Sequence, residues 1–91
     1  MKPDTRQSVE NRLARVEGQV RGVAAMVRED RYCMDVITQI RAARAALAKA
    51  EQAILADHLS TCVESAILSG DPEEQRKKIA ELVDVLGRTD R

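Results

Sequence analysis

The sequence predicts an all-α fold with three helices per chain. Apolar residues recur at steps of three and four along most of the chain, which is the period of one helix face. The 91 residues include no Phe or Trp and one Tyr, while 44% are hydrophobic, so the core must be built from aliphatic side chains. Two prolines and four glycines leave few positions at which a helix would break.

The first helix is expected over about residues 5–29 and the second over about residues 31–69. Glu29-Asp30-Arg31 interrupts the apolar pattern between them, and Asp30 is a suitable N-cap for the second helix. The stripe of the first helix consists of Val9, Leu13, Val16, Val20, Val23 and Val27. The stripe of the second consists of Cys33, Ile37, Ile40, Ala43, Leu47, Ala50, Ile54, His58 and Cys62.

A helix stop and a helix start stand next to each other after the second helix. Gly70 favours a left-handed C-terminal stop, and Asp71-Pro72 is typical of an N-cap followed by proline in the first helical turn. The third helix is therefore expected over about residues 72–87. No repeat or linker suggests a second domain, so residues 1–91 are interpreted as a single helical domain.

A second copy of the chain is expected to cover part of the long second helix. That helix carries more apolar stripe than the two shorter helices of the same chain can cover. Residues 41–50 are rich in Ala, and small side chains let two helices approach closely. High helix propensity would explain these alanines equally well.

Charge is balanced overall but uneven along the chain. Residues 1–49 carry ten Lys and Arg against six Asp and Glu, whereas residues 50–91 carry five against nine. The first half is therefore where an anionic partner would dock, although a solvated helix face also explains such charges.

No apolar run approaches the ~20 residues of a membrane span, and the N-terminus lacks a signal-peptide core, so a cytoplasmic protein is expected.

Two candidate metal ligands, His58 and Cys62, stand one helical turn apart and can share a ligand. The pair is a weak signal by itself, because a buried Cys commonly acts as a small hydrophobe and most helical His residues are not ligands. In a reducing compartment, however, two cysteines favour a reactive or metal-binding role over a structural disulfide.

A third candidate ligand, Cys33, strengthens this interpretation through geometry. It precedes His58 by 25 residues, roughly 37 Å along one helix at 1.5 Å per residue. If two second helices pair antiparallel about Ala46 or Leu47, Cys33 of one chain lies beside His58 and Cys62 of the other. Two thiolates and one imidazole suit Cu(I) and leave Zn(II) one ligand short, which a water or a Glu could supply.

The sequence resembles the copper-sensing operon repressor family, which also includes nickel/cobalt, formaldehyde and persulfide sensors. The likeness extends over nearly the whole chain. It rests on Arg12-Leu13-Ala14-Arg15-Val16-Glu17-Gly18-Gln19-Val20-Arg21-Gly22, on Tyr32-Cys33 followed by Asp35-Val36-Ile37-Thr38-Gln39-Ile40, and on His58 with Cys62. The resemblance implies an antiparallel four-helix-bundle homodimer, assembled as a dimer of dimers, that binds GC-rich operator DNA.

The resemblance also implies which residues face DNA. The matching first-helix motif supplies Arg12, Arg15, Gln19 and Arg21, and we expect Arg41, Arg44 and Lys49 to extend that surface on the second helix. Arginine suits bidentate, salt-sensitive phosphate contacts.

No Ser/His/Asp set, phosphate-binding Gly loop or paired carboxylates are evident, so the chain is not expected to be an enzyme.

The order Cys, His, Cys is that of the family's Cu(I) sensors. The resemblance thus implies a repressor that binds operator DNA in the apo form and releases it on binding Cu(I). A persulfide sensor that uses Cys33 and Cys62 is the closest alternative. Nickel sensors use further histidines, whereas His58 is the one His here, and formaldehyde sensors typically lack the last Cys. A protein that stores copper and binds no DNA is an alternative from a different functional class.

Copper sensors of the family also resemble one another in a Tyr beside the first Cys and a Glu in the third helix, both connected to the His. Tyr32 matches the first of these positions. The connection at Gly70-Asp71-Pro72 is about one turn longer than usual, so Lys78 takes the ungapped position and Glu81 the next turn. Glu81 is the expected partner of His58, with the register left open.

Overall fold

The computed structural model describes residues 1–88, with the side chains of residues 1–87. These residues form helix α1 (Pro3–Arg28), helix α2 (Cys33–His58), the π-helix η1 (Leu59–Val63), helix α3 (Glu64–Ser69) and helix α4 (Pro72–Arg88). Within this range there is no strand, and α2, η1 and α3 follow one another without a break. The prediction of an all-α chain with three helical stretches is therefore confirmed, although the second stretch begins at Cys33.

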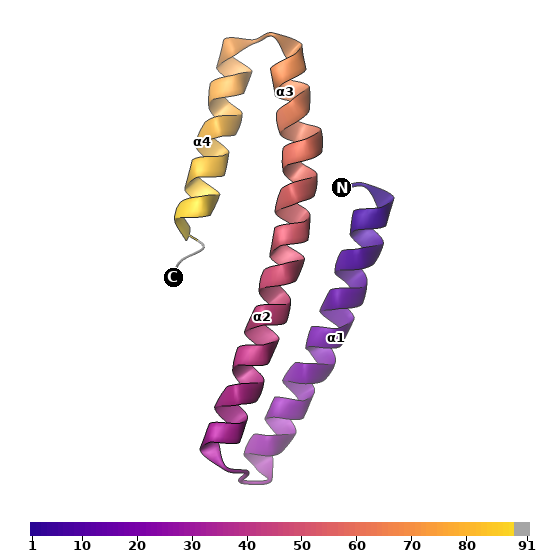
Figure 1. The fold of residues 1–91 in the computed structure, drawn as a ribbon, viewed down its shortest axis with the longest axis vertical. Coiled ribbons are helices and arrows are strands. Elements are labelled where there is room, and N and C mark those ends of the chain that lie inside the picture. Colours follow the sequence, from indigo (N-terminus) through magenta and orange to yellow (C-terminus); the bar gives the residue numbers. More distant parts are fainter. Residues whose placement is uncertain (89–91) are drawn as a thin grey trace. The chain divides into compact units, whose positions relative to one another are not determined.

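The chain divides into two compact units, Met1–Leu55 and Ala56–Arg91. In the first unit, α1 runs antiparallel beside α2 (Figure 1), and the buried residues are Val9, Val16, Ala43 and Ala50. In the second unit, α4 folds back along α3 (Figure 1), and Ala66 and Asp57 are buried. Most of the buried residues are small, so the helices of each unit pack at close range.

The turn between α1 and α2 corrects the prediction for Asp30, which is not an N-cap of α2. Its φ is +55°, in the left-handed region that L-residues rarely adopt. The N–H of Asp30 donates to the carbonyl of Val27 at 3.1 Å, and the N–H of Arg31 donates to that of Met26 at 3.0 Å. This pair of bonds is the Schellman motif, so Asp30 ends α1 instead of starting α2.

We expect Asp30→Gly to stabilise the protein by about 0.5 to 1 kcal/mol, because glycine adopts positive φ without a Cβ penalty and the change removes a carboxylate from a helix C-terminus. Asp30→Ala should lower the free energy of unfolding, since alanine keeps the penalty without the local hydrogen bonding of Asp. Urea unfolding followed by circular dichroism, at one protein concentration, measures both. Equal stabilities for the two variants would contradict the assignment.

The signals between α3 and α4 behave as predicted. Gly70 caps the end of α3 with φ +70°, and its N–H donates to the carbonyl of Ile67 at 3.3 Å. Asp71 Oδ1 accepts a 3.0 Å hydrogen bond from the N–H of Glu73, which is the N-cap contact, and Pro72 is the first residue of α4. The reversal that returns α4 along α3 is therefore encoded by three consecutive residues.

The π-helix η1 is a feature that helical periodicity did not predict. Ser60 Oγ and Thr61 Oγ1 donate to the backbone carbonyl of Asp57 at 3.1 and 2.8 Å. These hydroxyls compete with backbone N–H groups for that carbonyl, which favours the wider i→i+5 turn. The widened segment begins directly after His58 and contains Cys62, the two residues that the sequence predicts as metal ligands.

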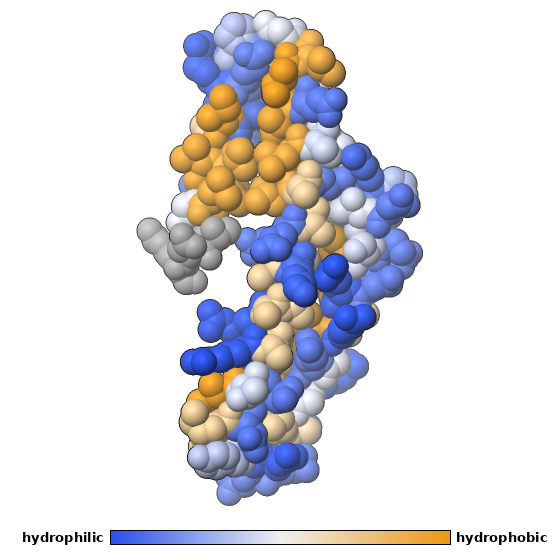
Figure 2. Space-filling model, viewed as in Figure 1, coloured by the Kyte–Doolittle hydropathy of each residue, from blue (hydrophilic) through white to orange (hydrophobic). Residues whose placement is uncertain are grey.

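Large apolar side chains remain exposed in both units of the single chain. On α2 these are Met34, Ile37, Ile40, Leu47 and Ile54, each at least 40% exposed. In the second unit, apolar side chains gather over α3 and α4 (Figure 2), among them Ile67, Ile79 and Val83. The helices of residues 1–88 include no candidate membrane span. A second copy that covers these exposed stripes stays a prediction.

Candidate metal centre and basic groove

Glu81 of α4 lies beside His58, at the end of α2. Glu81 Oε1 is 3.7 Å from His58 Nε2, and Glu81 Oε2 is 3.3 Å from Lys78 Nζ. The imidazole is 36% exposed and the carboxylate 50% exposed, so both are partly shielded by protein. Of the two residues that the sequence left open, the structure therefore puts the carboxylate next to the imidazole, and Lys78 pairs with that carboxylate.

The facing carboxylate determines which imidazole nitrogen can bind a metal. A metal-binding His usually presents its other ring N–H to a carboxylate, which holds the ring in one tautomer and orientation. Here Nε2 faces Glu81, so Nδ1 is the nitrogen left for a metal. Cys62 follows one turn later in η1 as an exposed free thiol, and Thr61 Oγ1 donates to its Sγ at 3.7 Å.

Cys33 and Tyr32 belong to the first unit. Cys33 is an exposed free thiol on the first residue of α2. Tyr32 is 69% exposed, and its carbonyl accepts the N–H groups of Asp35 and Val36 at 3.0 and 3.2 Å, which starts α2. Within residues 1–88 of one chain, no three His, Cys, Asp or Glu side chains come together as a metal site.

A basic groove runs between α1 and α2 in the first unit. Three cations and one amide line it, over a floor of small side chains: Arg12, Arg15, Gln19, Lys49, Ala42, Ala45 and Ala46. The alanines leave space that the longer side chains surround. Arg12 Nε and Gln19 Oε1 are buried atoms without a hydrogen-bond partner, so this groove holds unused capacity for a polar ligand.

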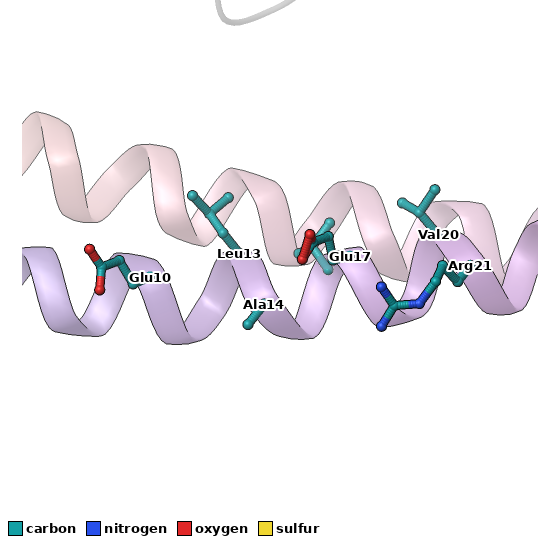
Figure 3. Close-up of a pocket in the computed structure, with 7 residues that line it drawn as sticks. Glu10, Leu13, Ala14, Glu17, Val20 and Arg21 are labelled. Atoms are coloured by element: carbon teal, nitrogen blue, oxygen red, sulfur yellow. The ribbon is translucent and has the colours of Figure 1, made fainter.

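The groove gathers four of the seven side chains that are expected to face DNA, three from the matching motif of the first helix and Lys49 from α2. Arg21 instead lines a more apolar hollow of α1, with Leu13, Glu17 and Val20 among its neighbours. Figure 3 shows Leu13, Val20 and Arg21 along the stretch of α1 that forms this hollow. Arg41 and Arg44 do not line the groove either. A role for these three arginines in DNA binding stays a prediction.

Sequence reasoning missed a second polar hollow on α1. It is lined by Asp4, Gln7, Ser8, Asn11, Arg12 and Arg15. The signal was available in principle, because these residues follow one another at steps of three and four and thus share a helix face. The periodicity of apolar residues alone does not reveal a polar face of this kind.

Comparisons with known proteins find relatives over most of the chain. The sequence model of a family described as metal-sensitive transcriptional repressor matches residues 5–88. The copper-sensing transcriptional repressor CsoR of Bacillus subtilis is 48% identical over 80 residues, which cover 88% of this chain and 76% of that protein. The copper-sensing transcriptional repressor RicR of Mycobacterium tuberculosis is 54% identical over 61 residues, which cover 67% and 64%.

Two solved structures share the fold. The copper-sensing repressor CsoR with Cu(I) from Geobacillus thermodenitrificans superposes with a TM-score of 0.88 at 36% identity, covering 100% of this chain and 92% of that one. The nickel-responsive transcriptional regulator InrS superposes with a TM-score of 0.76 at 40% identity, covering 86% and 88%. The same fold thus occurs in regulators named for different metals.

Proposed function

The chain belongs to the metal-sensitive transcriptional repressor family, and we propose that it is a Cu(I)-responsive repressor that binds operator DNA in its metal-free form and releases it when Cu(I) binds. The observation that carries the choice of metal is the donor set around His58. Its Nε2 faces Glu81, which leaves Nδ1 to join the thiolate of Cys62 one turn away.

The full proposed ligand set is Cys33, His58 and Cys62, two thiolates and one imidazole. This soft, three-coordinate set suits Cu(I), whereas Ni(II) and Zn(II) favour more nitrogen ligands or a fourth ligand. The relatives named for copper sensing support the same choice. InrS shares the fold and is named for nickel, so the fold does not decide which metal binds. We infer that the ligand residues decide it.

We place the site between two chains. Cys33 begins α2 and His58 ends it, so a continuous helix separates them in sequence, and Leu47 is exposed on the helix between them. Of the two expected centres, Ala46 lines the basic groove, so antiparallel pairing of two α2 helices about the exposed Leu47 would cover the apolar stripe and leave the groove open. The same pairing would bring Cys33 of one chain beside His58 and Cys62 of the other, giving two equivalent sites per dimer.

We place operator DNA on the basic groove of the first unit. Arg12, Arg15 and Lys49 supply positive charge around it, and the unpartnered Arg12 Nε is a donor that a phosphate oxygen would satisfy. Counterion release from the phosphates would provide most of the affinity. Cu(I) would act on this surface through the assembly of the chains, because the ligands and the groove occupy different residues.

A DNA-binding titration tests this proposal, with Cu(I), Ni(II), Zn(II), formaldehyde and polysulfide added in separate reactions to the protein on DNA from its own promoter region. We expect Cu(I) to release the DNA at one ion per chain and the other additions to have little effect. Release by polysulfide alone would replace the copper function with persulfide sensing by Cys33 and Cys62. Cu(I) binding without any DNA affinity would make the protein a copper store.

A further inference from the structure

The polar hollow on α1 is continuous with the basic groove. Arg12 and Arg15 line both, the groove together with α2 and the hollow together with residues nearer the N-terminus of α1. A ligand that lies along the groove and extends past these two arginines would therefore meet the hollow next. Gln7 and Asn11 are the amide side chains at that position, and both are exposed.

The two amides hold each other in a defined orientation. Gln7 Nε2 donates to Asn11 Oδ1 at 2.9 Å across one helical turn. This bond leaves both N–H groups of Asn11 Nδ2 as donors and Gln7 Oε1 as an acceptor. Adjacent donors and acceptors in fixed positions match the edges of bases, where an amide side chain can pair with N6 and N7 of adenine.

The hollow is less suited to phosphate than the groove. Apart from the two arginines that it shares with the groove, the hollow is lined by no cation. Its other residues are Asp4, Gln7, Ser8 and Asn11, and the negative charge of Asp4 repels phosphate. Asp4 also lies in the first turn of α1, where a carboxylate stabilises the helix, so its presence alone implies no ligand. Neutral amides suit contacts with base edges, whereas the flanking arginines suit contacts with the phosphate backbone.

We propose that Gln7 and Asn11 read base edges in the operator while Arg12, Arg15 and Lys49 hold the neighbouring phosphates. The inference rests on the proposed function, because it assumes that DNA lies on the groove. It adds the residues that make binding specific for sequence, whereas the groove accounts for affinity.

The test uses the duplex that the full-length wild-type protein enriches from a library of random DNA, together with a scrambled duplex of the same composition. We expect Asn11→Ala and Gln7→Ala to lower the ratio of the two affinities roughly tenfold or more, with an unchanged slope of log affinity against log salt. Arg15→Ala should instead weaken both duplexes alike and reduce that slope by about 0.9. Gln75→Ala on α4 is the matched amide control and should change neither quantity.

The outcomes separate this inference from the proposed function. An unchanged affinity ratio in Asn11→Ala and Gln7→Ala, or equal weakening of both duplexes, overturns the base-reading role while leaving the repressor intact. A wild-type protein that enriches no sequence overturns both proposals together. Circular dichroism and Cu(I) uptake of each variant report folding independently of DNA, so a loss of specificity in a folded, copper-binding variant supports the inference.

Discussion

Mixed dimers of a Cys33→Ala chain and a Cys62→Ala chain are expected to regain a copper site that neither variant forms alone. In each homodimer, every site lacks one thiolate. In the mixed dimer, one site combines Cys33 of the second chain with His58 and Cys62 of the first and is complete, while the other lacks both thiolates. Competition against a Cu(I) chelator, on dimers purified through two different tags, should find one tight site per mixed dimer.

The matched control for this experiment pairs Cys33→Ala with a chain that carries both substitutions. No arrangement of these two chains restores two thiolates at one inter-chain site, so tight binding should stay absent. If the site were made within one chain, the mixed dimer of the two single variants would bind no Cu(I) tightly, because neither chain carries both cysteines. Failure of the first mixture to bind Cu(I) tightly, in a folded mixed dimer, would therefore refute the inter-chain site.

His58→Ala should abolish or strongly reduce Cu(I)-induced DNA release while leaving the DNA affinity of the metal-free protein nearly unchanged. Among the three proposed ligands, the contacts described for residues 1–87 give the imidazole a carboxylate partner on another helix, since Nε2 is 3.7 Å from Glu81 of α4. Coupling of this kind is typically worth about 1 to 3 kcal/mol, or roughly 5- to 150-fold in DNA affinity. Fluorescence anisotropy of labelled operator, with and without saturating Cu(I), measures that ratio.

Two further variants make this result specific. Glu81→Gln keeps a polar side chain beside His58 but removes its charge, so Cu(I) should still bind while its effect on DNA falls. Glu73→Gln, on the first turn of the same helix, should behave as the wild type. Full Cu(I)-induced release by His58→Ala would show that the imidazole is not the trigger, and a wild type that responds to polysulfide but not to Cu(I) would favour persulfide sensing.

Local signals predicted the fold well where a few adjacent residues decide the conformation. Gly70, Asp71 and Pro72 stop one helix and start the next through left-handed φ, an N-cap oxygen and a preset proline φ. Asp30 was assigned to the wrong helix, because the same residue type can cap a helix start or adopt positive φ at a helix end. Only the hydrogen bonds of the turn distinguish the two.

The candidate site depended on contacts between residues distant in sequence. Periodicity placed His58 and Cys62 one turn apart, but it did not choose between Lys78 and Glu81, since that choice depends on how far α4 returns along the preceding helix. Periodicity also did not predict the π-helix that contains Cys62, because it results from competition between Ser60, Thr61 and backbone N–H groups for one carbonyl.

By itself, the sequence determined the number of helical stretches and their approximate ends, and it supplied the candidate ligands, because these follow from the spacing and chemistry of near neighbours. The tertiary structure alone decided that Arg12, Arg15, Gln19 and Lys49 share one groove and that Glu81 faces His58. Both results depend on which faces of two helices meet. For the groove, the buried Ala43 and Ala50 let α1 and α2 meet at close range. For Glu81, the distance by which α4 returns along the preceding helix sets which of its residues faces His58. Spacing along one helix predicts its apolar face, but it does not specify how two helices align when they pack.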